Sequence, residues 1–149
     1  MSPETANFRQ ANTMERAFNR AYGFFVGMGL GFSYSYLLEV RGRKSGKLFS
    51  TPVSLLELGG KKFLVAPRGE TQWARNAEAA GEVTLKRGSR RQKYRVRPLV
   101  DGEKPEVLKT YLDSYKGAVQ KFFPVKAGSP VSAFIELAGR YPVFEIFAV

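Results

Sequence analysis

From residue 35 onwards, the chain is built of short apolar or alternating runs, and turns rich in glycine separate these runs. Runs of this length and pattern are typical of β-strands. Gly59-Gly60 and Gly88-Ser89 each separate two such runs by two residues, which is the spacing of a tight β-hairpin. The predicted strands cover residues 35–41, 48–58, 61–66, 82–87, 90–100 and 142–149.

Helical signals stand before, between and after these strands. Phe18, Tyr22 and Phe25 recur at helical spacing and predict an N-terminal helix over about residues 13–31. Start and stop residues predict three further helices. These are a short helix capped by Thr71 and ended by Gly81, one from Asp101 to about Tyr115, and one that Ser129-Pro130 begins and Gly139 ends.

Six strands connected mainly as hairpins predict an antiparallel β-barrel, with the helices packed outside it or over its mouth. This is an α+β arrangement and not a series of βαβ units. No internal repeat, low-complexity tract or linker interrupts the 149 residues. We therefore expect a single domain over residues 1–149.

The chain contains no cysteine and no histidine. This absence excludes disulfides, thiolate nucleophiles, Cys/His zinc sites, a Ser-His-Asp triad and a histidine general base. We expect no metal site, and we expect a bound cofactor to supply the difficult chemistry if the protein is an enzyme. The lack of cysteine fits a cytoplasmic protein.

The net charge of +11 indicates an anionic partner, which could be nucleic acid, an anionic membrane or a polyanionic small molecule. The densest basic run extends from Lys86 to Arg97 without an acidic residue. One interpretation is a nucleic-acid or lipid surface. We favour a solvated strand face that protects a sheet edge with charge, because no aromatic residues suited to stacking bases are evident there.

Residues 21–38 hold no charged residue and carry Gly23, Gly27 and Gly31. This small-xxx-small spacing is found in membrane helices, but the segment is at the lower length limit for a membrane span. We favour a helix end packed closely on the barrel, followed by the first strand. A peripheral membrane contact stays open as an alternative.

A basic loop, Gly42-Arg43-Lys44-Ser45-Gly46-Lys47, lies between the first two predicted strands. It is not a Walker A motif, because its glycines are one residue too close and a strand follows it. Two glycines would still let backbone N–H groups face an anion, and three cations surround them. A solvated basic turn is the alternative interpretation.

A second cluster, residues 68–76, joins a predicted strand to a predicted helix. Such a junction offers free N–H groups and the positive end of a helix dipole to an anion. Trp73, the only tryptophan, is by itself more typical of a core than of a site.

These clusters occur in the order of a known family. Residues 37–46, Thr51-Pro52-Val53, residues 65–69 and Trp73-Ala74-Arg75-Asn76 resemble the deazaflavin-dependent nitroreductase family. The similarity covers about residues 36–100, and residues 141–145 are also similar. The resemblance implies a split β-barrel and coenzyme F-420, a deazaflavin with a phosphate and an oligoglutamate tail.

The resemblance also implies roles for particular residues. The loop would hold the phosphate and tail, the second strand would line the deazaflavin ring, and the following turn and helix would complete the pocket. In that order, the residues are Arg43, Lys44, Ser45, Gly46 and Lys47, then Thr51, Pro52 and Val53, then Ala66, Arg68 and Gly69, and finally Trp73 and Asn76.

Three departures from the family pattern concern the tail and the acceptor. Many members have an arginine where this chain has Phe49, and a tyrosine that faces the acceptor matches Ser54 here. The tyrosine-rich segment near the C-terminus is not evident. The family resemblance therefore supports the identity of the cofactor better than that of the acceptor.

The resemblance implies hydride transfer from the reduced deazaflavin to an organic acceptor such as a quinone, a nitro compound or an activated enone. Ser54, a tyrosine or water would provide the proton. Alternatives are an FMN- or haem-binding split barrel, a nucleic-acid-binding module and a membrane-surface protein. A homodimer is one option for the oligomeric state.

Overall fold

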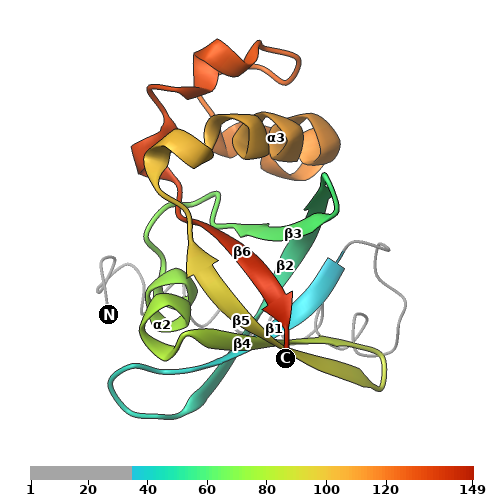
Figure 1. The fold of residues 1–149 in the computed structure, drawn as a ribbon, viewed down its shortest axis with the longest axis vertical. Helices are drawn as coiled ribbons and strands as arrows, with labels where there is room; N and C mark the ends of the chain where they lie inside the picture. The colour runs from blue at the N-terminus through green and yellow to red at the C-terminus, as the bar shows by residue number, and fades with distance from the viewer. Residues whose placement is uncertain (1–34) are drawn as a thin grey trace.

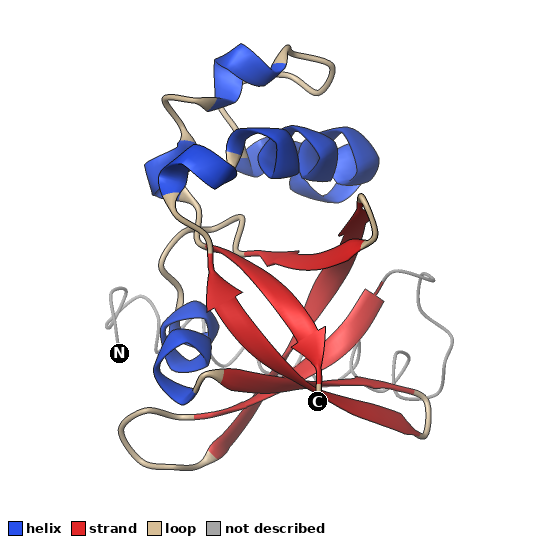
Figure 2. Cartoon of the chain, viewed as in Figure 1, coloured by secondary structure: helices blue, strands red, loops and turns tan. Residues whose placement is uncertain are grey.

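The computed structural model describes residues 35–149, and the predicted helix over residues 13–31 lies outside this range. Six antiparallel strands close into a barrel in the order β1-β2-β3-β6-β5-β4 (Figures 1 and 2). The fold class predicted from the sequence is therefore confirmed. The strands are β1 Ser35–Arg41, β2 Leu48–Leu58, β3 Lys61–Val65, β4 Glu82–Arg87, β5 Arg90–Pro98 and β6 Val143–Ala148.

Both predicted hairpins are present because glycine supplies the backbone angles that a two-residue turn requires. Gly59 and Gly60 have φ values of 61° and 78°, and they connect β2 to β3. Gly88 has a φ of 64° at the turn between β4 and β5. Residues with a Cβ rarely adopt these positive angles, which explains why the turn signals locate the hairpins so closely.

The barrel closes through the last strand, because β6 pairs with β3 on one side and with β5 on the other. β5 also pairs with β4, so it is not an edge strand. The interpretation of its basic run as protection for a sheet edge is therefore wrong. Closure of a barrel removes the edge that such charges would guard.

Helix α2, Gln72–Ala80, packs beside β4 and β5 at one end of the barrel (Figure 1). It buries Ala74 and Ala77, and Gly81 ends it in the left-handed conformation, as predicted. Thr71 occupies the N-cap position, but its side chain makes no capping hydrogen bond. The predicted capping role of the Thr71 hydroxyl is therefore wrong.

The segment after β5 differs from the prediction at both of its helices. Asp101 begins a short 3-10 turn, η1 Asp101–Glu103, and the α-helix α3 runs from Pro105 to Val119. The predicted helix from Ser129 to Gly139 consists of two 3-10 turns, η3 Val131–Phe134 and η4 Ala138–Arg140. A further turn, η2, covers Gln120–Phe122.

Phe134 in η3 and Leu137 just before η4 are both buried in the core between α3 and the barrel. Tertiary packing of this kind outweighs the weak local helix signals of the segment. These turns and α3 form a layer over the barrel at the β2–β3 side (Figure 2).

The hydrophobic core is divided in two. One cluster fills the barrel around Leu38, Leu64 and Phe144, and the other lies between the barrel and α3 around Leu108 and Leu112.

None of the helices within residues 35–149 is long and apolar enough to cross a membrane. The uncharged segment 21–38 is described only from Ser35 onwards, where it is the start of β1. The predicted change to a strand at its end is confirmed.

Ion pairs tie the α3 layer to the barrel and give stability a pH dependence. Arg97 on β5 hydrogen-bonds both Glu103 at 3.2 Å and Glu145 at 3.0 Å. Hydrogen bonds from Arg97 and from the Val100 amide lower the pKa of Glu103, and hydrogen bonds from Lys109 and the Gly128 amide lower the pKa of Asp113.

A carboxylate with a lowered folded-state pKa stabilises the protein above its unfolded-state pKa, and this stability is lost as pH falls through the folded-state value. We therefore expect the free energy of unfolding to fall on acidification below about pH 4, the ordinary carboxylate range. Urea titrations at several pH values would measure this dependence. Glu103→Gln should flatten the slope, and an unchanged slope would contradict the assignment.

Candidate functional site

The β1–β2 loop, residues 42–47, is a tight turn held together by hydrogen bonds within the loop. The Gly42 amide donates to the Lys47 carbonyl at 2.7 Å, and the Gly46 amide donates to the Gly42 carbonyl at 3.0 Å. The Lys47 amide donates to Ser45 Oγ at 3.2 Å. The expectation that glycine amides of this loop converge on an anion is therefore wrong, because hydrogen bonds inside the loop occupy them.

The side chains of the loop, rather than its backbone amides, are available to an anion. Arg43, Lys44, Ser45, Gly46 and Lys47 are all exposed. The chain has no acidic residue between Val40 and Leu56, so no carboxylate from the loop competes for these cations. The loop presents positive charge through side chains rather than through a backbone nest.

Arg43 is held in place by helix α2. Its Nη1 donates to Asn76 Oδ1 at 2.8 Å and to Gln72 Oε1 at 3.0 Å, and its backbone amide donates to the same Asn76 oxygen at 3.0 Å. Asn76 is buried, which fixes the oxygen that receives both bonds. The structure therefore joins two clusters that lie more than thirty residues apart in the sequence.

The predicted ring-lining residues lie on β2 beside the loop. Thr51, Pro52, Val53 and the candidate proton donor Ser54 are half-buried, and they pair with β1 from Leu38 back to Ser35. Val53 packs against the core of the barrel. These residues form a wall of intermediate exposure next to the exposed cations.

The turn between β3 and α2 leads directly into the helix that holds Arg43. Leu55 pairs with Leu64, so the chain before Leu55 and the chain after Leu64 continue towards the same end of the barrel. Ala66 is fully buried and donates to the Pro142 carbonyl, whereas Arg68 is exposed and Gly69 turns the chain with a φ of 93°. The Ala66 carbonyl also accepts from the Gly69 amide, so Ala66 shapes the turn from the inside.

Trp73 is a core residue in the main. Its ring lies 5.9 Å from that of Phe144, at a tilt of 50°, and it packs against the interior cluster of the barrel. The interpretation of Trp73 as core is confirmed, although its side chain is only half-buried.

One polar atom near this site was not foreseen as functional. Thr71 Oγ1 is buried, and within residues 35–149 it has no hydrogen-bond partner. It stands at the N-cap of α2, where the first backbone N–H groups have no partner within the helix and the helix dipole is positive. Because this oxygen is buried, it does not face a ligand at the surface.

The donor set fits a polyanionic coenzyme. Arg43, Lys44 and Lys47 supply charge, and helix α2 orients Arg43 in advance. The phosphate and carboxylates of coenzyme F-420 match such donors, because charge-assisted hydrogen bonds are the strong ones. Gln72 could have been foreseen, because it lies one helical turn before Asn76 and shares its face.

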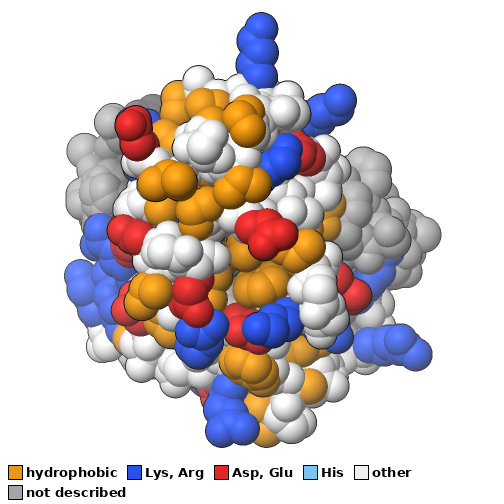
Figure 3. Space-filling model, turned by 45° about the horizontal axis from the view of Figure 1, so that its top comes forward, with side chains coloured by type: hydrophobic (Ala, Val, Ile, Leu, Met, Phe, Trp, Pro, Cys, Tyr) orange, Lys and Arg blue, Asp and Glu red, His pale blue; other side chains and the backbone are white. Residues whose placement is uncertain are grey.

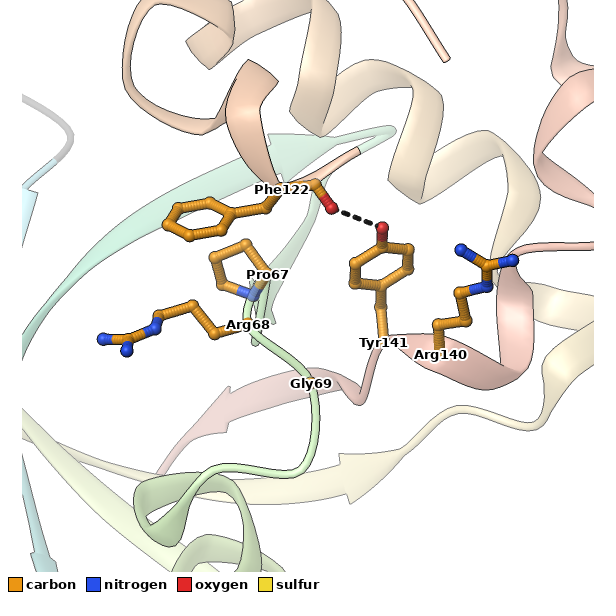
Figure 4. Close-up of a pocket in the computed structure, with 6 residues that line it drawn as sticks. All are labelled: Pro67, Arg68, Gly69, Phe122, Arg140 and Tyr141. Atoms are coloured by element: carbon orange, nitrogen blue, oxygen red, sulfur yellow. Dashed lines mark hydrogen bonds between the residues drawn. The ribbon is translucent and has the colours of Figure 1, made fainter. Parts of the chain in front are cut away.

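A pocket of about 420 Å³ adjoins the β3–α2 turn (Figure 4). The Phe122 ring lies over Pro67, and the side chains of Arg68 and Arg140 extend in opposite directions on the two sides. The Tyr141 hydroxyl donates to the Phe122 carbonyl at 2.6 Å, so it closes one wall. No sequence signal joined residue 68 to residue 140, because only the closure of the barrel brings them together.

The basic run on β4 and β5 is partly neutralised. Arg91 pairs with Glu39 at 3.0 Å, and Lys93 lies 3.6 Å from Glu82. Figure 3 shows the face that carries the α3 layer, where apolar side chains and carboxylates stand between the cations. The positive charge is therefore not gathered on that face.

Several solved structures share this fold. A structure described as an F420-H2 dependent reductase (FDR-A) is 22% identical, with 77% of this chain and 95% of that chain covered at a TM-score of 0.51. The protein Atu2129 of unknown function from Agrobacterium tumefaciens is 18% identical, with coverages of 99% and 57% and a TM-score of 0.54. HutZ, the haem storage protein from Vibrio cholerae, is 8% identical, with coverages of 78% and 82% and a TM-score of 0.55. At these identities the likeness shows the fold alone.

No curated protein matches the chain. A family model does match, over residues 8–123, which is most of the sequence. Its description agrees with the cofactor implied by the sequence resemblance and with the donor set of the site. The chain belongs to the F420H(2)-dependent quinone reductase family, and it is an oxidoreductase that uses coenzyme F-420.

Proposed function

We propose that this enzyme reduces a quinone, with reduced coenzyme F-420 as the hydride donor. The observation that carries the proposal is the family match over residues 8–123, and the exposed, acid-free β1–β2 loop supports it. Nitro compounds and activated enones are also electron-poor acceptors, but the family description favours quinones.

Each part of the site binds a different part of the coenzyme in this proposal. Arg43, Lys44 and Lys47 bind the phosphate and tail, with Ser45 and Gly46 shaping the turn. Thr51, Pro52 and Val53 of β2 form a wall for the ring together with Arg68 and Gly69, and the buried Ala66 supports that turn from behind. Trp73 and Asn76 support the pocket from α2. The coenzyme, when bound in its reduced form, supplies a hydride from C5.

The proton for the acceptor comes from water in this proposal. Tyr115 and Tyr141 donate their hydroxyl protons to the carbonyls of Leu55 and Phe122. Burial raises the pKa of Tyr141, which makes its phenol a weaker acid. Ser54 is half-buried on β2 and remains a candidate that orders such a water.

Titration of the protein with oxidised coenzyme F-420 and, separately, with FMN tests the proposal. We expect coenzyme F-420 to bind more tightly, because its tail carries several carboxylates and the loop carries three cations. An FMN-binding split barrel is the alternative. Tighter binding of FMN would contradict the proposed function.

Asn76→Ala should weaken coenzyme binding although Asn76 itself is buried. The substitution removes the oxygen that accepts two hydrogen bonds from Arg43, so the guanidinium loses its fixed position. A loss of about 1 kcal/mol, roughly fivefold in the dissociation constant, is typical of one such bond. Glu78→Ala on the exposed side of α2 is the matched control. Equal losses in the two variants would show that Asn76 has no positioning role.

A further inference from the structure

We infer that the pocket lined by Pro67, Arg68, Gly69, Phe122, Arg140 and Tyr141 is the acceptor subsite, and that Arg140 stabilises the anion of the reduced quinone. This inference rests on the proposed function, since it names the place and the charge of the acceptor. Arg140 belongs to none of the sequence clusters that resemble the family.

The position of the pocket is the first argument. Pro67, Arg68 and Gly69 belong to the turn that follows β3, and Arg68 and Gly69 are also among the residues proposed to line the deazaflavin ring. Helix α2 begins just after this turn, and its Gln72 and Asn76 accept hydrogen bonds from Arg43 of the loop. The pocket is therefore continuous along the chain with the proposed ring site and with the helix that orients the loop.

The shape of the pocket suits a flat acceptor. Figure 4 shows the Phe122 ring over Pro67 on one side and the Tyr141 ring on the other. A volume of about 420 Å³ lies within the range of small-ligand sites. Aromatic rings prefer stacked or tilted neighbours, so a quinone ring finds suitable contacts on these walls.

The charge of the pocket is the second argument. Its lining contains two arginines and no carboxylate. The charge of Arg140 also acts on the Tyr141 phenol, since it opposes the rise in the pKa of that group. With the Tyr141 proton engaged by the Phe122 carbonyl, the pocket offers cations rather than an acid to the acceptor.

Such an environment matches the product of hydride transfer. The quinone accepts two electrons and one proton as a hydride from the reduced deazaflavin, which leaves a quinol monoanion. The coenzyme releases its second proton to solvent as it becomes oxidised, and the quinol monoanion takes up one proton from solvent, so the two protons balance and the quinol is complete. A guanidinium beside the developing oxyanion stabilises the transition state that leads to the quinol monoanion.

Calorimetric titration with two naphthoquinones tests the inference without turnover. 2-Hydroxy-1,4-naphthoquinone is an anion at neutral pH and mimics the charge of the reduced quinone, whereas 1,4-naphthoquinone has nearly the same shape and no charge. Wild type should bind the anion more tightly. Arg140→Gln should lose this preference by on the order of tenfold, as expected for a charge-assisted bond, and Arg140→Lys should keep part of it.

The controls separate this inference from the proposed function. Arg90→Gln, an exposed change on the β4–β5 hairpin, should bind both quinones like wild type. Coenzyme titration of Arg140→Gln should match wild type, because the pocket that Arg140 lines contains none of the loop cations. An anion preference that is absent in wild type, or that survives in Arg140→Gln, overturns the inference. Failure of wild type to bind coenzyme F-420 overturns the proposed function, while the quinone titrations still decide the pocket.

Discussion

Phe134→Ala is expected to lower the free energy of unfolding by about 3–5 kcal/mol, the usual effect of removing a fully buried phenylalanine. Phe134 has 0% exposure and lies in the core between α3 and the barrel. Its ring meets that of Phe123 edge-on at a centroid distance of 6.4 Å. The truncation would leave a cavity that the 3-10 turn around it cannot fill.

Urea titration followed by circular dichroism measures this effect. The neighbouring Ile135→Ala is the matched control, because Ile135 is 62% exposed and loses little buried area. We expect the control to remain within about 0.5 kcal/mol of wild type, as surface substitutions usually do. Similar losses in the two variants would show that the η3 turn does not anchor this layer.

The strands and hairpins could be predicted from the sequence because their causes are local. Gly59-Gly60 and Gly88 accept positive φ angles, and the runs on either side have strand character. Helix α2 could be predicted for the same reason, since Gly81 ends it in the left-handed conformation. Local backbone chemistry was sufficient wherever one or two residues determine the turn.

The α3 layer could not be predicted as closely because its structure depends on what lies beneath it. Helical start and stop residues around Ser129 and Gly139 are compatible with one helix, but the chain forms two 3-10 turns. Phe134 and Leu137 of this segment are buried in the core between α3 and the barrel. Intrinsic helix signals are weak compared with such tertiary contacts.

The candidate site was predicted in its parts but not in its connections. The family pattern pointed to both Arg43 and Asn76, yet the hydrogen bond between them arises only when α2 packs against the β1–β2 loop. The expected backbone nest was wrong because the loop amides bond internally. Arg140 had no signal, since a lone arginine before a strand looks like any other surface cation.

The other large effect concerns coenzyme binding. Replacing Arg43 and Lys44 by alanine should raise the Michaelis constant for the coenzyme through a loss of about 1–3 kcal/mol for each residue, the range of charge-assisted hydrogen bonds. Turnover should fall much less, because the tail is remote from the reacting carbon and its binding energy is the same in ground state and transition state. Added salt should weaken the coenzyme binding of wild type more than that of the double variant.

The matched control is the β4–β5 hairpin with Arg90, Arg91 and Lys93 replaced by alanine. This variant loses three positive charges, whereas the loop variant loses two. A general effect of net charge would therefore weaken coenzyme binding in the hairpin variant at least as much as in the loop variant. Two of its three cations already face carboxylates, Arg91 that of Glu39 and Lys93 that of Glu82, whereas the loop has no acidic residue of its own. Steady-state kinetics with varied coenzyme should therefore show a raised Michaelis constant in the loop variant alone. If the hairpin variant loses coenzyme binding while the loop variant keeps it, the anion site lies on the hairpin and the proposed tail site is wrong.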